Sequence, residues 1–125
     1  MTTPVAEAPV RGEVSGLFEL MCLRKAAARA FDPLGFTLYE VMLLLSIEEG
    51  VGRPQELREL LDVSAPAVSG LVTKLMDAGL VSRTAAGQDA RKVSVRLTTK
   101  GCVAVHLIRD AWTAQTIEKR EKLER

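Results

Sequence analysis

The stretch Val63–Arg83, VSAPAVSGLVTKLMDAGLVSR, decides the fold, because it holds the start, the faces and the end of one short helix. Ser64 is a good N-cap, and Pro66 falls in the first turn, where a missing N–H costs little. Gly79 is placed to end the helix in the left-handed conformation. The sequence therefore predicts a helix with a front of small, mostly polar residues and an apolar back at helical spacing. The apolar back consists of Val68, Leu71, Val72 and Leu75.

The front of this helix can approach another surface closely, and the major groove of DNA admits one α-helix. We expect the serines to contact phosphates or base edges, alanine and proline to contact thymine methyl groups, and Thr73 or Lys74 to reach the DNA backbone. The helix has no Arg, Asn or Gln, so bidentate contacts to guanine and adenine are missing and direct base reading is expected to be modest. The candidate DNA-binding residues of this helix are Ser64, Ala65, Pro66, Ala67, Ser69, Gly70, Thr73 and Lys74.

Two helices are expected early in the chain, after a loose arm at residues 1–12. The first covers residues 13–30, and the second follows Thr37, which forms a capping box with Glu40. The second helix is apolar over more than half its circumference and is the expected centre of the core. The apolar stripe of the first helix consists of Val14, Leu17, Phe18, Met21 and Cys22. The inward residues of the second are Leu38, Val41, Met42, Leu44 and Leu45.

A third helix is expected to open at Pro54 and to turn Leu57, Leu60 and Leu61 inward. Because only a few residues separate it from the helix after Ser64, the two form a helix-turn-helix. Periodicity then changes: residues 80–84 read as a short strand, and residues 92–98 alternate apolar and polar side chains, which is typical of a half-buried strand. A helix-turn-helix followed by such a hairpin is a winged helix, and a last helix is expected at about residues 100–123.

The length of 125 residues suggests one domain. The composition limits the classes of function that the chain can have. The formal net charge is only +1, but residues 64–100 carry six cationic and two anionic side chains, while the remainder has an excess of anions. A basic segment on a mildly acidic body is typical of a protein that binds a polyanion, although chance segregation gives the same pattern. One histidine, no Gly-rich phosphate loop and no carboxylate or cysteine cluster indicate that the chain is not an enzyme and needs no metal or cofactor.

The two cysteines, Cys22 and Cys102, have no metal-binding spacing and are expected to be reduced and mostly buried. No apolar run approaches the length of a membrane span, and residues 1–10 lack the features of a signal peptide. The expected location is therefore the cytoplasm, without a membrane partner.

In order and spacing, these segments resemble the MarR family of bacterial winged-helix regulators over about Thr37–Gly101. The resemblance is carried by residues 37–40 (TLYE), 57–60, 63–64, 68–75, 78–81, 89–91 with the D-x-R motif, and 95–101 with the L-T-x-x-G motif. It implies a mainly α fold with a β-hairpin wing, in which the recognition helix enters the major groove of a pseudo-palindromic operator and the wing enters the minor groove. It also implies a dimer, a repressor or activator role, and release by a small phenolic or lipophilic ligand or by an oxidant.

The wing is expected to carry the strongest single DNA contact. Arg91 can enter a narrow minor groove, where the negative potential is enhanced, and Asp89 can hold it by a charge-assisted hydrogen bond, as the family's D-x-R pattern suggests. Lys92 and Arg96 are expected to touch phosphates, with pairing to an acidic residue as the alternative for Arg96. The other interpretation of the wing tip is a set of ordinary solvated charges.

The resemblance assigns residues 13–36 and 99–125 to dimerisation helices around a DNA-binding lobe at 37–98. Family members usually have further C-terminal helix, so a smaller or differently assembled dimer is expected. A weak effector pocket near the junction is also expected, with ordinary core aromatics as the alternative. Cys22 as an oxidant sensor is disfavoured, because it lies too close to Thr37. The candidate pocket residues are Phe18, Phe36, Tyr39, His106 and Trp112.

Taken together, the sequence predicts a sequence-specific DNA-binding transcriptional regulator, acting as a repressor through a dimer on double-stranded DNA and released by a small effector. The alternative is a winged-helix module for protein–protein contact with weak or no DNA binding. Near-neutral charge and a recognition helix without long base-reading side chains are the two features that support this alternative.

Overall fold

The computed structural model describes residues 11–85 and 93–124. The predicted helices and strands occur in the predicted order, and the boundaries stated for them from the sequence lie within two residues of the observed ones. In chain order the elements are α1 (Arg11–Phe31), the 3-10 turn η2 (Asp32–Leu34), α2 (Leu38–Glu48), α3 (Pro54–Leu61), α4 (Ala65–Asp77), β1 (Val81–Ala85), β2 (Val93–Leu97) and α5 (Thr99–Glu124). The 3-10 turn was not predicted.

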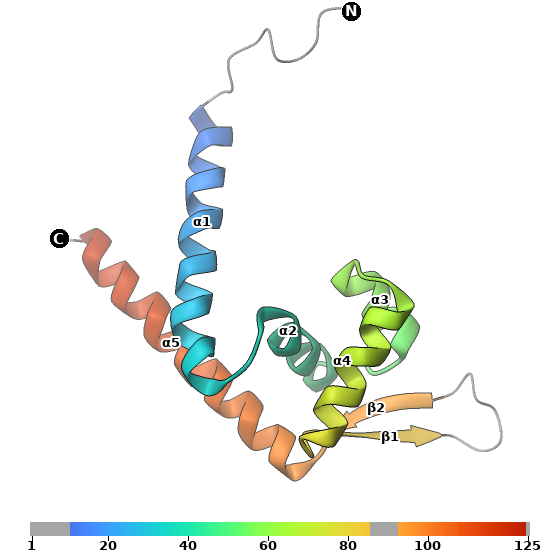
Figure 1. Ribbon diagram of the computed structural model, residues 1–125. Coiled ribbons are helices and arrows are strands. Elements are labelled where there is room, and N and C mark those ends of the chain that lie inside the picture. Colours follow the sequence, from blue (N-terminus) through green and yellow to red (C-terminus); the bar gives the residue numbers. More distant parts are fainter. Residues whose placement is uncertain (1–10, 86–92, 125) are drawn as a thin grey trace, which may run out of the picture.

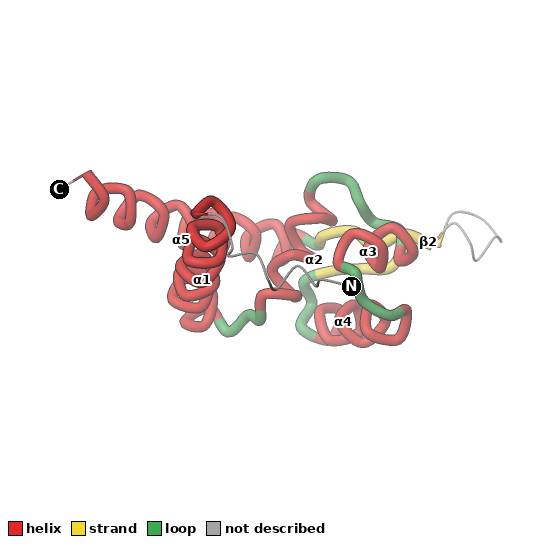
Figure 2. The backbone as a smooth tube through the Cα atoms, turned by 90° about the horizontal axis from the view of Figure 1, so that it is seen from above, coloured by secondary structure: helices red, strands yellow, loops and turns green. Residues whose placement is uncertain are grey.

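The described part of the chain consists of a compact lobe and two long helices. Figure 1 shows α2, α3, α4 and the hairpin gathered on one side, with α1 and α5 extending away from them on the other. In the second view, at right angles, α1 again crosses α5 on the side opposite the hairpin (Figure 2). The strands pair antiparallel, with Val81 opposite Leu97 and Arg83 opposite Val95. The lobe therefore presents α4 and the wing away from the long helices.

The hydrophobic core lies around α2. Leu43 and Leu44 are fully buried there, and α3, α4, α5 and β2 all contact this helix. Two predicted core residues of α2, Leu38 and Met42, are instead exposed. When a helix has apolar residues on most of its circumference, their spacing does not show which side faces solvent. The prediction therefore assigned Leu38 and Met42 to the core, although they lie on the solvent-exposed side of α2. The other buried apolar residues of the lobe and of α5 include Val41, Ile47, Leu57, Leu61, Val68, Val72, Leu75, Leu80, Val81, Val95, Val105 and Ile108.

The prediction for α3 was wrong at Leu60, which is 57% exposed. This helix has eight residues, and only Leu57 and Leu61, one turn apart, reach the core. Leu60 lies on the flank of that pair and meets solvent. The prediction of buried cysteines was also wrong, because Cys22 and Cys102 are both exposed on the long helices.

The predicted helix starts are confirmed in atomic detail. The Thr37 hydroxyl accepts from the N–H of Glu40 at 3.2 Å, and the N–H of Thr37 donates to Glu40 Oε1 at 2.9 Å, which completes the capping box. The Ser64 hydroxyl accepts from the N–H of Ala67 at 3.2 Å. Gly79 follows α4 with φ of +77°, the left-handed conformation predicted for it.

Residues at the start of α5 donate hydrogen bonds to the backbone carbonyls that follow α4. Thr98 donates from its hydroxyl to the Gly79 carbonyl at 2.6 Å and from its N–H to the Leu80 carbonyl at 3.0 Å. Lys100 Nζ donates to the Ala78 carbonyl at 2.9 Å, and the N–H of Gly101 donates back to the Thr98 hydroxyl at 3.0 Å. Carbonyls at a helix end need such partners, so the motif at 97–101 joins the end of α4 to α5.

No single helix in the described residues is long and apolar enough to cross a membrane. Within the described part of the chain, one pair of consecutive helical segments, Val14–Leu34 and Leu38–Glu48, has the length and composition of a span when taken together, but the two are bent by 84° relative to each other.

Candidate nucleic-acid interface

The front of α4 is open to solvent as predicted. Val68, Val72 and Leu75 are buried, and the helical period therefore turns Pro66, Gly70 and the residues near them outward. A Cβ at Gly70 would meet nothing within 4 Å, so the outward surface is unobstructed at its middle. All eight candidate residues of this segment are exposed: Ser64, Ala65, Pro66, Ala67, Ser69, Gly70, Thr73 and Lys74.

The wing residues divide between described and undescribed parts of the chain. Arg96 is exposed on β2 and pairs in register with Ser82 on β1. Asp89, Arg91 and Lys92 lie outside the described residues. The roles assigned to them from the sequence stay predictions.

Lys74, expected to contact the DNA backbone, has a partner inside the protein. Its ammonium lies 3.5 Å from Glu40 Oε1, which belongs to α2 and is 34 positions away in the sequence. Burial raises the pKa of the Glu40 carboxyl, but the hydrogen bonds from Thr37 and the charge of Lys74 outweigh it and hold that pKa below its ordinary value. The carboxyl is therefore ionised at neutral pH and forms a true ion pair.

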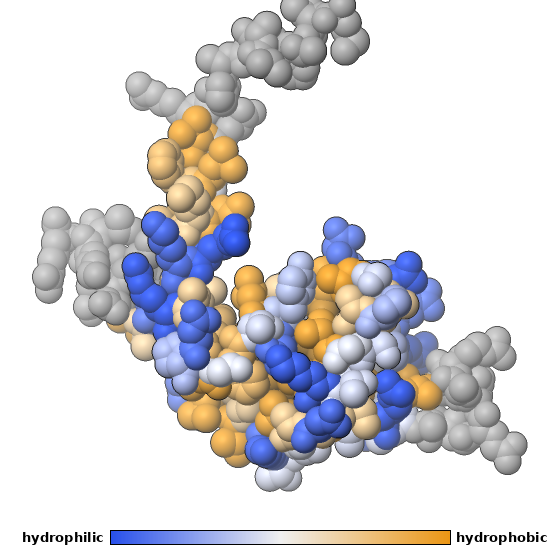
Figure 3. All heavy atoms as spheres, in the orientation of Figure 1, coloured by the Kyte–Doolittle hydropathy of each residue, from blue (hydrophilic) through white to orange (hydrophobic). Residues whose placement is uncertain are grey.

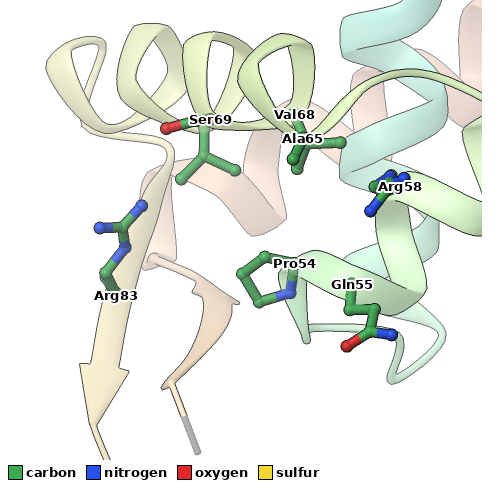
Figure 4. A pocket seen from close by; sticks show the side chains of 8 residues that line it. Pro54, Gln55, Arg58, Ala65, Val68, Ser69 and Arg83 are labelled. Atoms are coloured by element: carbon green, nitrogen blue, oxygen red, sulfur yellow. The ribbon is translucent and has the colours of Figure 1, made fainter. Parts of the chain in front are cut away.

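A cavity of about 220 Å³ lies between α3, α4 and β1. Figure 4 shows the Arg83 guanidinium and the Ser69 hydroxyl on one side of it and Arg58 on the other, with Pro54 below and Ala65 and Val68 above. In the described residues, no carboxylate forms a salt bridge with either arginine. An apolar cavity with two cations and a hydroxyl at its rim is suited to a small, flat anion.

Sequence reasoning missed this cavity, although one signal was present. Residues two apart on a strand share a face, so buried Val81 places Arg83 on the inner side of the hairpin. The contribution of Pro54, Gln55 and Arg58 was not predictable, because it depends on how α3 sits against α4.

The five residues predicted for an effector pocket lie in different environments, and none of them lines the cavity beside Arg83. Phe18 is 62% exposed on α1, and Tyr39 is 50% exposed on α2. His106 is exposed on α5, with its Nε2 3.5 Å from Asp110 Oδ2. Phe36 and Trp112 pack against the core, where Trp112 stacks on Phe31 with ring centroids 5.9 Å apart.

An apolar face is left uncovered on the long helices. Figure 3 shows hydrophobic side chains along the outer part of α1, where the helix extends beyond the lobe. The opposite end of α1 reaches the core through Ala26, Ala27, Ala30 and Phe31. The large exposed apolar residues of the two helices are Val14, Leu17, Phe18, Leu20, Met21, Leu23, Val103, Leu107 and Ile117.

Known proteins share both this sequence region and this arrangement. Residues 34–92 match the model of the MarR family. The chain is similar to the HTH-type transcriptional repressor Rv2887 of Mycobacterium tuberculosis (strain ATCC 25618 / H37Rv), with 34% identity over 80 residues. That similarity covers 63% of this chain and 58% of the repressor, so the chain matches less than two thirds of the length of this curated relative.

Solved structures extend the likeness beyond the matched region. The structure of the Multiple Antibiotic Resistance Repressor, MarR, superposes with a TM-score of 0.78 at 24% identity, covering 94% of this chain and 86% of that one. Rv1404 from Mycobacterium tuberculosis gives 0.76 at 19% identity, covering 92% and 82%. Rv2887 in complex with salicylic acid gives 0.70 at 26% identity, covering 90% and 84%. The predicted fold class, a winged helix-turn-helix between N- and C-terminal helices, is confirmed.

Proposed function

We propose that the chain, whose residues 34–92 match the model of the MarR family, is a transcriptional repressor that binds operator DNA as a homodimer. Members of this family are regulators and not enzymes, in agreement with the sequence prediction. A repressor of chromosomal genes acts in the cytoplasm. Asp89, Arg91, Lys92 and Arg96 are the proposed wing contacts.

The observation that carries the proposal is the exposed front of α4, which lies beside the hairpin on the side of the lobe away from α1 and α5 (Figure 1). Its small residues let the helix backbone approach base edges closely, and the wing strands next to it bring a second contact to the same DNA. This placement supports major-groove docking of α4.

The uncovered apolar face of α1 and α5 supports a homodimer. Monomeric proteins rarely leave contiguous apolar patches of this kind open to water. A two-fold pairing through these helices repeats α4 on the partner, and two recognition helices about one DNA turn apart fit a pseudo-palindromic operator.

Operator binding is tested by selecting duplexes of about 30 base pairs from a random-sequence library and titrating the selected duplex against its scrambled version at several salt concentrations. We expect the selected sequence to contain inverted half-sites about 10 base pairs apart. The logarithm of the association constant should fall steeply with the logarithm of the salt concentration, because phosphate contacts release counterions.

A flat salt dependence with no selected sequence would overturn the proposal. The protein-interaction alternative predicts that result, since a winged helix that binds a protein partner makes no phosphate contacts. Selection of a single half-site with steep salt dependence would contradict the dimer but not DNA binding.

We further propose that the effector is a small aromatic carboxylate and that it binds in the cavity beside Arg83. The relative Rv2887 has been solved with salicylic acid and with p-aminosalicylic acid. In this chain, Arg83 or Arg58 would hold the carboxylate, and Val68, Val72 and Pro54 would contact the ring. The cavity is also lined by Ala65 and Ser69, which are candidate DNA contacts, so an occupied cavity and bound DNA compete for the same groups. The aromatic residues named from the sequence are the alternative, and of these Tyr39 is exposed while Phe36 and Trp112 pack against the core.

Arg83→Ala should weaken salicylate binding about 10- to 100-fold, because it removes a charge-assisted hydrogen bond. Isothermal titration of the free protein measures this directly. Arg96→Ala is the matched control, since Arg96 lies on the neighbouring strand and does not line this cavity, and it should bind salicylate as the unmodified chain does. Salicylamide, which lacks the carboxylate, should not bind. Unchanged salicylate affinity in Arg83→Ala would place the effector elsewhere, and Tyr39→Ala and Trp112→Ala would then be measured.

A further inference from the structure

The ion pair between Glu40 and Lys74 connects the recognition helix α4 to the first turn of α2, the helix around which the core is built. The Glu40 side chain is only 4% exposed, and its Oε1 accepts from the N–H of Thr37 as well as lying near Lys74 Nζ. A buried carboxylate that lacks a cationic partner is costly. Lys74 therefore supplies the charge that this carboxylate needs, and α4 is held against the start of α2 at that point.

The position of Lys74 around the helix agrees with this role. Ser69, on the flank of α4 that lines the cavity, and Lys74 are five residues apart, or about 140° around the helix axis. Lys74 thus lies on the opposite flank, toward α2, and does not extend from the front. Its side chain is 65% exposed, yet its charge is offset by the carboxylate beneath it.

The short side chains on the front of α4 explain why the ion pair between Glu40 and Lys74 would affect DNA binding. Its contacts come from alanine, proline, glycine, serine and threonine, whose side chains are short. A long arginine or glutamine can adjust its torsion angles when a helix is slightly displaced, whereas a methyl group or a hydroxyl cannot. A helix that contacts DNA through short side chains must be placed accurately by its own protein.

We propose that Lys74 is a positioning residue for DNA binding, which fixes α4 through Glu40, and that it does not contact a phosphate. This inference rests on the proposed DNA-binding function. It departs from the role that the sequence alone gives to Lys74, the only cation on the helix.

The test compares Lys74→Met, Lys74→Arg, Glu40→Gln and the double variant Glu40→Gln/Lys74→Met on the selected duplex over a range of salt concentrations. A positioning role predicts that Lys74→Met binds about fivefold more weakly per protomer, the size of an ion pair, with an unchanged salt slope. Lys74→Arg, which keeps the positive charge, should bind the duplex with the affinity of the unmodified chain. Glu40→Gln keeps the capping box but removes the carboxylate charge, so it should weaken binding as Lys74→Met does, and the double variant should be no weaker than either single one.

Phosphate contact predicts a different pattern. Lys74→Met would then reduce the salt slope by about 0.9 per protomer, and Glu40→Gln would strengthen binding or leave it unchanged, because it frees the cation. Either result, or Lys74→Met with full affinity, would overturn the inference while leaving the proposed function in place. An unmodified chain that binds no duplex would overturn the proposed function and this inference with it. Thermal melting of each free variant checks that the lobe is folded.

Discussion

Gly101→Ala is expected to destabilise the protein by about 3 kcal/mol, the upper end of the usual cost of overpacking. A Cβ at this position would overlap the carbonyl oxygen of Leu80 and lie 3.3 Å from Leu97 Cδ2. The Leu80 carbonyl cannot move freely, because it accepts from the N–H of Thr98. Gly101 is itself held in place, because its N–H donates to the Thr98 hydroxyl. The added methyl group must therefore separate the end of α4 from the start of α5.

Thermal and urea unfolding at one fixed protein concentration measure this effect, and we expect the melting temperature to fall by roughly 10 °C. Gly70→Ala is the matched control. It makes the same change in a helix where a Cβ meets nothing within 4 Å, so it should stabilise the protein by about 0.5–1 kcal/mol through helix propensity. Equal stability of Gly101→Ala and the unmodified chain would show that the junction tolerates the methyl group and is not a rigid connection.

The parts of the fold that the sequence predicted correctly are those that depend on interactions between residues close together in the chain. The starts at Thr37 and Ser64 and the end at Gly79 depend on hydrogen bonds within a few residues, and all three are confirmed. The alternation of the second strand likewise predicted β2. The L-T-x-x-G motif was recognised only as a resemblance, and the physical need for its glycine at position 101 emerged from the contact with Leu80.

Contacts between segments that are far apart in the sequence could not be predicted from local patterns. Glu40 was predicted as half of a capping box, but its second partner, Lys74, lies in another helix and could be assigned only once α2 and α4 were placed together. The cavity beside Arg83 depends in the same way on α3, α4 and β1. Exposure of Met42 and Cys22 was mispredicted because an apolar pattern indicates a face that needs a partner but does not say whether that partner belongs to the same chain.

Leu17→Glu is expected to convert the proposed homodimer into a monomer. In the single chain Leu17 is 64% exposed on α1, so a charged side chain there should leave the folded monomer almost unchanged, within about 0.5 kcal/mol. In a homodimer built on this face, the change removes about 1.5–3 kcal/mol of apolar burial from each protomer and adds a carboxylate that loses water. Because two-fold symmetry introduces the change twice, the dissociation constant should rise by roughly a thousandfold or more. Sedimentation velocity at micromolar concentration should then give a monomer.

Operator binding should fall with the dimer, because two half-sites held by one protein gain about 10²–10⁴ in avidity over one half-site. Leu60→Glu is the matched control: Leu60 is 57% exposed on α3, and the same substitution there should leave the sedimentation coefficient unchanged. The contrast between two similarly exposed leucines separates a specific interface from general surface hydrophobicity. Leu17→Glu that sediments as a dimer would mean that α1 is not the interface, and the apolar residues of α5 would then carry the pairing.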